Sequence, residues 1–338
     1  MANTSTPLAM VIAGIVIALS GGHAGAQSVA RIELQPIQTV TLKTQQILTG
    51  ETKGAPATLA GELRIPKPGS DRLPVVVLIH GSGGVGGNVD AWAKEINSLG
   101  VAAFILDTFS GRGIVSTVSD QSQLDSLAMV IDAYRALSML AQHPRIDPAR
   151  IAVMGFSKGA VPAVYSSNER FRKLYNPAKV SFAAHIGLYT PCNVQYRDDD
   201  KVTGAPIRLF HGIADDYVAI APCRGYVERL KRAGANVTLT EYPDAHHAYD
   251  STALPQRIQN PQAQTTRNCT LREGDNGEVL NAKTGAIYTL ADSCVEHGPC
   301  RLQSSCLPGN RESGARISGG NVQVEQLKLR VAVAPTPP

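Results

Sequence analysis

Apolar residues in the middle of the chain fall into two patterns: short continuous runs and longer runs with a helical period. Residues 74–80 form a nearly continuous run rich in β-branched side chains, and residues 101–106 are apolar throughout; such runs are typical of strands buried on both faces of a parallel sheet. Between them, residues 88–99 repeat apolar side chains at helical spacing and end at Gly100, a common helix stop. The pattern predicts a strand, a helix and a second strand in succession.

The longest helical pattern covers residues 120–142 and ends before Pro144. Its apolar side chains recur at steps of three and four residues and form one stripe. They are Leu124, Leu127, Ile131, Tyr134, Leu137 and Ala141. Asp147 and Pro148 then predict a turn into a third buried strand around Ile151.

Further strands are predicted at residues 180–188, 206–210 and 237–241, with a helix at 221–233 closed by Gly234. Strands that alternate with helices in this way favour an α/β fold with a mostly parallel, doubly wound sheet flanked by helices. We expect this core to span residues 73–255.

Upstream of the core, residues 40–44 and 61–66 are short alternating stretches between turn-rich segments. They predict antiparallel strands at the edge of the same sheet. We therefore assign residues 27–72 to the N-terminal strands of the sheet.

The first 26 residues have the layout of a signal peptide. Residues 8–20 are apolar and uncharged, and Ala24-Gly25-Ala26 has the small-x-small form of a cleavage site, although no Lys or Arg precedes the apolar stretch. That stretch is shorter than the about 20 residues that a membrane span needs. We expect a periplasmic or secreted protein with no stable membrane partner after signal removal; a retained N-terminal anchor is the alternative.

The cysteine content fits an exported protein. The six residues are Cys192, Cys223, Cys269, Cys294, Cys300 and Cys306. No C-x-x-C pair or His at zinc spacing is present, so no metal site is predicted, and an oxidising compartment would allow disulfides. We expect Cys192 to pair with Cys223 and Cys269 with Cys294, and leave the last two open.

Four of these cysteines lie in residues 256–306, a polar, turn-rich segment. We expect it to be an accessory extension held by disulfides. Residues 307–338 lack helical or strand periodicity, and we expect them to be largely disordered.

Charge is spread along the chain, with 32 Lys and Arg against 28 Asp and Glu and a formal net charge of +4. This balance does not indicate a partner defined by charge, so no nucleic-acid partner is expected. The acidic trio at 198–200 is expected in a solvated loop, and Asp244 and Asp250 as loop caps or surface charges. The sequence does not determine the oligomeric state.

Residues 150–160, R-I-A-V-M-G-F-S-K-G-A, place G-x-S-x-G directly after an apolar strand and before a run of small residues. This is the layout of a nucleophile elbow, a sharp strand-to-helix turn that exposes a serine. Gly155 and Gly159 suit a turn that is too tight for side chains. Ser157 is therefore the candidate nucleophile.

A serine hydroxyl needs a base to remove its proton and an acid to orient that base. Asp215 and His247 each follow a predicted strand, in the chain order serine, acid, histidine. We favour Asp215 over its neighbour Asp216, and His247 over its neighbour His246.

An oxyanion hole would complete this machinery with backbone N–H donors. One donor is expected from Lys158, the residue after the serine. The other is expected from the glycine-rich loop at 80–84, with Ser82 preferred and Gly83 close behind. A phosphate-cradling role for this loop is weaker, because the loop lacks the G-x-G-x-x-G spacing and a following Gly-Lys-Ser/Thr.

Five motifs together resemble the dienelactone hydrolase family, over roughly residues 40–255. They are H-G-S-G-G at 80–84, D-T-F-S-G-R-G-I at 107–114, G-F-S-K-G at 155–159, H-G-x-x-D-x-x-V at 211–218 and Y-P-x-A-x-H-A-Y at 242–249. The resemblance implies an α/β-hydrolase fold, a triad of Ser157, Asp215 and His247, and hydrolysis of carboxylic esters or lactones without a metal or other cofactor.

The chain departs from the family's founding enzymes, which use cysteine as nucleophile and a gating glutamate. In this chain position 157 is serine, and the glycine-rich loop at 80–84 stands where those enzymes have the glutamate. We therefore expect a serine carboxylesterase for a small-molecule ester rather than a dienelactone hydrolase in the strict sense. An amidase or peptidase on the same fold, and a secreted binding protein without turnover, are the alternatives.

Residues that would contact the substrate are less defined. Gly83, Arg112 and Tyr189 are candidates, and Arg112 would suit an anionic group. Alternatively, Arg112 is a loop arginine paired with a carboxylate. Trp92 would fit the cleft or the apolar face of its own helix equally well.

Overall fold

A computed structural model describes residues 29–251, 263–265 and 267–288, and the backbone of 258–259, 294–295 and 316–317. The predicted signal segment lies outside the described residues, as does nearly all of the segment after residue 306. In the part of the chain that is described, no helix has the length and apolar character to cross a membrane.

The core is an eight-stranded sheet with the order β1-β2-β4-β3-β5-β6-β8-β9. β1 and β2 are antiparallel to each other, β2 is antiparallel to β4, and all the other neighbouring pairs are parallel. The strands are β1 (Arg31–Thr41), β2 (Ala55–Ile65), β3 (Leu73–Ile79), β4 (Ala102–Asp107), β5 (Ile146–Phe156), β6 (Ala184–Leu188), β8 (Ile207–Gly212) and β9 (Val237–Tyr242). The mostly parallel sheet with an antiparallel edge was predicted, but the two antiparallel strands, β1 and β2, are each 11 residues long. The predicted strand at 40–44 is largely wrong, because β1 ends at Thr41 and Thr44 begins a helix.

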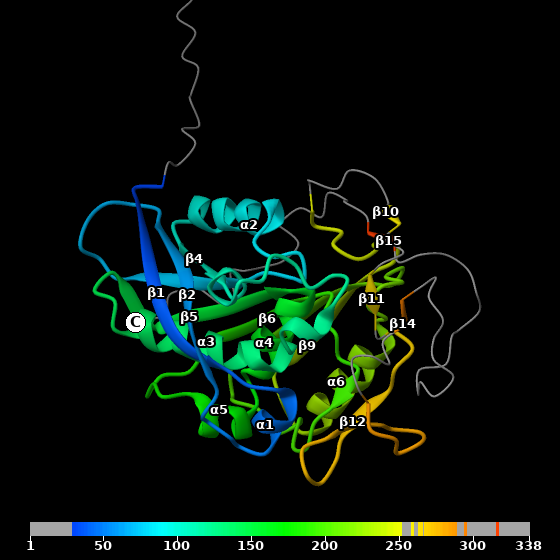
Figure 1. The fold of residues 1–338 in the computed structure, drawn as a ribbon. Helices are drawn as coiled ribbons and strands as arrows, with labels where there is room; N and C mark the ends of the chain where they lie inside the picture. Colours follow the sequence, from blue (N-terminus) through cyan, green and yellow to red (C-terminus); the bar gives the residue numbers. More distant parts are fainter. Residues whose placement is uncertain are drawn as a thin grey trace, which may run out of the picture.

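Helices cover both faces of this sheet (Figure 1). Every residue of β3 is buried, and alternate side chains enter two separate apolar clusters: Val77 in one and Val76 in the other. The first cluster includes side chains of α3 (Met129–Ala141), α4 (Ala160–Tyr165), α5 (Glu169–Tyr175), α6 (Ala221–Arg232) and the short α1 (Thr44–Leu48). The second cluster is covered by α2 (Gly87–Ser98). Burial on both faces explains the continuous apolar run of this strand.

The predicted helix at 120–142 is wrong in its first third, because α3 begins only at Met129. Asp120 caps a short 3₁₀ turn, and Leu124 is extended, with φ −149° and ψ 119°. The Asp125 carboxylate accepts the backbone N–H of Thr44 at 2.6 Å. The non-helical stretch therefore carries a contact with a distant segment of the chain.

Two local expectations also need correction. Asp147 and Pro148 do not form a turn before the strand; they lie inside β5, next to a register irregularity opposite β3. Within the acidic trio at 198–200, Asp199 is not solvated. It is 3% exposed and forms an ion pair with Arg229 of α6 at 2.6 Å.

A buried ion pair joins three parts of the core. The Arg112 guanidinium, in the loop after β4, donates to both carboxylate oxygens of Asp132 in α3, at 2.8 and 2.9 Å. Thr39 of β1 donates to the same carboxylate at 2.7 Å, and Arg112 donates to Thr41 at 2.7 Å. The arginine and aspartate side chains are only 5% and 0% exposed. The carboxylate partner left open for Arg112 in the sequence is therefore Asp132.

The extension packs against the core through a small sheet. Its strand β12 (Leu271–Glu273) pairs in parallel with β7 (Val194–Gln195), in the loop after β6, and in antiparallel with β13 (Val279–Asn281). The buried Glu273 carboxylate accepts hydrogen bonds from Arg170 and Arg197 of the core. These contacts fix the extension on the core.

Disulfides lie close to this junction. The predicted bond between Cys192 and Cys223 is present and ties the loop after β6 to α6. Cys269 is also disulfide-bonded. The side chain of Cys294 lies outside the described residues, so its pairing with Cys269 stays a prediction.

Candidate active site

Ser157 occupies a sharp turn between β5 and α4. Its φ of +52° is a left-handed value that non-glycine residues rarely adopt. A Cβ at Gly155 would lie 2.0 Å from the carbonyl oxygen of Gly159, and one at Gly159 would lie 2.2 Å from that of Ile79. Backbone contacts this close require glycine at both positions. The turn therefore has the geometry of a nucleophile elbow.

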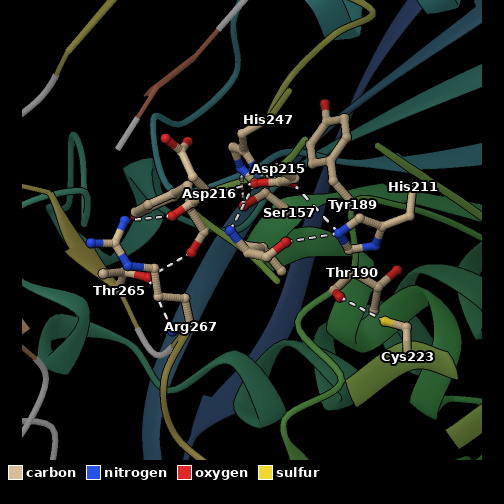
Figure 2. A network of polar contacts seen from close by, with 12 residues as sticks. Ser157, Tyr189, Thr190, His211, Asp215, Asp216, Cys223, His247, Thr265 and Arg267 are labelled. Carbon is tan, nitrogen blue, oxygen red and sulfur yellow. Dashed lines mark hydrogen bonds and ion pairs between the residues drawn. The ribbon is translucent and has the colours of Figure 1, made fainter. Parts of the chain in front are cut away.

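The predicted acid and base lie beside this serine (Figure 2). His247, in the loop after β9, has Nε2 2.9 Å from Ser157 Oγ and Nδ1 2.9 Å from Oδ2 of Asp215, in the loop after β8. All three residues are less than 9% exposed. Because the carboxyl ends of parallel strands share one edge of the sheet, three loops distant in sequence meet at one point.

The surroundings of Asp215 favour its ionised form. Burial opposes ionisation, but the His247 charge and the hydrogen bonds from His211 and His247 outweigh it and hold the pKa of Asp215 below its usual value. The backbone N–H groups of Tyr217 and Val218 also donate to Oδ1 at 3.0 and 2.8 Å. An ionised carboxylate only accepts, so Nδ1 of His247 donates to it and Nε2 is free to take the serine proton.

Aromatic rings hold the His247 imidazole in place. The rings of Tyr189 and Tyr217 contact it edge-on, each with centroids 4.7 Å apart. The Tyr189 hydroxyl donates to Asp250 at 2.8 Å, and Trp92 Nε1 donates to the same carboxylate at 2.7 Å. Asp250 is therefore not a surface charge; it supports the histidine loop through Tyr189 and Trp92.

A cavity of about 300 Å³ opens next to Ser157. Its lining from the core includes both predicted oxyanion donors, Ser82 and Lys158. The other lining residues are Thr44, Gln121, Asp125, Ser126, Leu127, Val161, Pro191, Asn193, Val194, Tyr196, Tyr217, Val218, Gln264, Thr265, Leu271, Val279 and Tyr288. The proposed substrate contacts Gly83, Arg112 and Tyr189 are not part of this lining, and neither is Trp92, which packs with α2 in the core.

Gln121 connects the two predicted oxyanion loops and was not identified from the sequence. Its Nε2 donates to Ser82 Oγ at 3.0 Å, and its Oε1 accepts from Lys158 Nζ at 3.0 Å. Its own backbone N–H donates to the Gln264 side chain of the extension at 2.7 Å. Gln121 lies in the stretch that the sequence predicts as helix, so its pattern gave no signal of this role.

The Lys158 ammonium is buried and makes no ion pair within 4.0 Å among the described residues. Burial lowers the pKa of Lys158 to about 8, although the nearby Asp125 and Asp120 charges act in the opposite direction. At pH 7 the folded protein therefore holds a buried cation that the unfolded chain would leave in water.

We expect Lys158→Met to raise the free energy of unfolding at pH 7 by about 1–3 kcal/mol, because it removes the desolvation cost of this charge. The wild type should gain stability between pH 8 and 10.5, where the unfolded chain binds more protons than the folded one. The gap between variant and wild type should therefore close over that window in urea titrations. Lys94→Met, at a lysine 70% exposed, is the control and should change little. A variant less stable than the wild type at pH 7 contradicts the argument.

No cluster of three or more His, Cys, Asp or Glu side chains that could hold a metal ion occurs among the described residues. The candidate site is made of side-chain and backbone groups at the carboxyl edge of the sheet. The sheet order, the elbow and the hydrogen-bonded serine, histidine and aspartate are those of an α/β-hydrolase.

The family assignment is direct. The model of the "Dienelactone hydrolase family" matches residues 59–269, more than half of the chain. The chain belongs to this family, and the resemblance seen in its motifs is confirmed.

Comparisons with individual proteins give distant similarity. A putative dienelactone hydrolase from Klebsiella pneumoniae is 16% identical and superposes with a TM-score of 0.48 over 65% of this chain and 88% of the other. Esterase 2 of Thermogutta terrifontis, phosphoramylated by tabun, is 17% identical, with a TM-score of 0.47 over 66% and 86%. "Dipeptidyl peptidase family member 1" of Caenorhabditis elegans is 23% identical over 56% of this chain, which spans only 27% of that protein.

Proposed function

We propose that the protein is an exported serine carboxylesterase that forms an acyl-enzyme on Ser157. The observation that carries the proposal is the pair of 2.9 Å contacts from His247 to Ser157 Oγ and to Asp215. The Ser157 hydroxyl is hydrogen-bonded to an imidazole, and a buried carboxylate orients that imidazole. This arrangement activates a hydroxyl as a nucleophile. Export rests on the N-terminal sequence and the cysteine content alone.

In the first step, Ser157 Oγ attacks the ester carbonyl while His247 Nε2 takes its proton. The Asp215 carboxylate stabilises the imidazolium and keeps its orientation. The oxyanion of the tetrahedral intermediate would accept hydrogen bonds from the backbone N–H groups of Lys158 and Ser82. Gly81 brings the second donor close: a Cβ there would lie 3.2 Å from the Phe156 carbonyl oxygen and 3.4 Å from Ser157 Cβ.

Collapse of the tetrahedral intermediate breaks the bond to the alcohol oxygen, and the imidazolium returns its proton to that oxygen. The alcohol leaves and the acyl group stays on Ser157. In the second step His247 takes a proton from water, which attacks the acyl-enzyme through the same oxyanion site. The carboxylic acid is released, and Ser157 recovers its proton.

A fluorophosphonate probe tests the proposal, because it reacts covalently only with an activated serine. We expect stoichiometric labelling of the wild type and none of Ser157→Ala, with p-nitrophenyl acetate hydrolysis lost in parallel. Ser138→Ala, on α3, is the matched serine control and should label and hydrolyse like the wild type. Labelling that persists in Ser157→Ala, or a wild type that neither labels nor hydrolyses, contradicts the proposal.

Ester and amide substrates differ in the leaving group that His247 must protonate. The amidase alternative is measured with a p-nitroanilide of the same acyl group. We expect the ester to have the higher kcat/KM; the reverse order would favour the amidase.

A further inference from the structure

The cavity beside Ser157 is built from two parts of the chain. Its polar part belongs to the core: Ser157, Ser82 and Lys158 meet there, and Gln121 links the last two by hydrogen bonds. Its apolar part is shared with the extension. There Leu271 packs against Val194 and Val279 in one small cluster, and Tyr288 packs against the same cluster. These four side chains also line the cavity.

The extension is fixed where it lines the cavity. Leu271 N donates to the Asn193 carbonyl oxygen at 2.9 Å, and the parallel pairing of β12 with β7 sets Leu271 opposite Val194. Further along the wall, the Thr265 hydroxyl donates to the Tyr217 carbonyl oxygen at 2.6 Å. A backbone bond at Leu271 and a side-chain bond at Thr265 therefore hold this segment against the core.

The cavity is placed for the acyl side of an ester. The leaving alcohol must lie next to His247, which returns a proton to it. His247 does not line the cavity, whereas Ser157 and both candidate oxyanion donors, Ser82 and Lys158, do. A group that enters the cavity from the carbonyl carbon is therefore the acyl chain.

We propose that residues 263–265 and 267–288 are a specificity-determining wall, which closes the apolar end of the acyl site and selects esters of short to medium aliphatic acids. This inference rests on the proposed esterase function. The cavity of about 300 Å³ is at the small end of ligand sites, about 300–1,000 Å³. Leu271 and Val279 limit the chain length. Both lie beyond residue 269, where the match to the family model ends, so the match covers the start of the wall but not these two residues.

The test is the acyl-chain profile of kcat/KM on p-nitrophenyl esters from acetate to decanoate. Leu271→Ala and Val279→Ala each enlarge the apolar end, so we expect the ratio of decanoate to acetate to rise about 10-fold, the effect of filling a hydrophobic pocket with one or two more methylene groups. Ile287→Ala is the matched control: it lies on the same extension, is 66% exposed and does not line the cavity. Its profile should equal that of the wild type.

Val279→Phe fills the apolar end of the cavity instead of enlarging it. It therefore tests the wall without creating a packing defect. It should reduce hydrolysis of the longer esters and leave acetate hydrolysed. Fluorophosphonate titration counts the active sites of each variant, and thermal unfolding shows whether each is folded. If the variants are folded and fully labelled but keep the acyl-chain profile of the wild type, the proposed role of the wall is wrong and the esterase function stands. A wild type that does not label overturns the esterase function itself.

Discussion

Asp215→Asn is expected to lower kcat for ester hydrolysis by about 10⁴-fold while leaving the fold intact. The Asp215 carboxylate accepts the Nδ1–H of His247 at 2.9 Å, which leaves Nε2 unprotonated and facing Ser157 Oγ. An amide at this position can donate to Nδ1 and so favours the tautomer with the proton on Nε2, which cannot accept the serine proton. Steady-state hydrolysis of p-nitrophenyl acetate measures the loss.

Asp216→Asn is the matched control, because it makes the same chemical change one residue away. Its backbone carbonyl accepts a hydrogen bond from the Arg267 guanidinium at 2.6 Å, and His247 is hydrogen-bonded to Ser157 and to the carboxylate of Asp215, not to that of Asp216. We expect its kcat to stay within a few-fold of the wild type. Equal losses in the two variants, or a loss below about 10-fold in Asp215→Asn, would remove Asp215 from the mechanism.

The second large effect is on stability. Arg112→Met leaves the Asp132 carboxylate buried without its cation, and we expect the free energy of unfolding to fall by about 3–5 kcal/mol. A typical domain has only about 5–15 kcal/mol of stability. Burial already raises the pKa of Asp132 against the opposing effect of Arg112. Urea titration monitored by circular dichroism measures the change.

Two further variants show whether the unpaired charge is the cause. Arg112→Met combined with Asp132→Leu removes both charges and should recover much of the lost stability. Arg150→Met breaks the pair of Arg150 with Asp147, whose side chains are 30% and 27% exposed, and should cost less than about 1 kcal/mol. A double variant as unstable as Arg112→Met would point to lost packing and not to charge.

Much of the fold follows from local sequence because burial in a parallel sheet leaves a local signature. The run that becomes β3 is apolar throughout, since both its faces are covered. The elbow is equally readable, because Gly155 and Gly159 meet backbone at distances that exclude any side chain. Asp215 and His247 can also be predicted from the sequence, because each follows a predicted strand and the two occur after Ser157 in the order acid, then histidine.

Other features depend on contacts between distant segments and leave no local signature. The helical stripe before Met129 is present in the sequence, but the chain there forms two 3₁₀ turns, and the Asp125 carboxylate between them accepts the backbone N–H of Thr44 from a distant segment. Asp199 and Asp250 read as surface charges, and each is buried only because its partners arrive from other elements. The role of Gln121 and the apolar wall likewise arise only when the extension meets the core.

The pairing of β12 with β7 has a consequence for how the enzyme is made. Chains emerge from the ribosome N-terminus first, and domains fold as they become available. Ser157, Asp215 and His247 are all synthesised before Leu271, the residue that pairs with Val194 at the cavity. During synthesis the reactive serine and its base can therefore assemble while one side of the acyl site is still open. The proposed wall is therefore translated after every catalytic residue whose substrate range it is proposed to set.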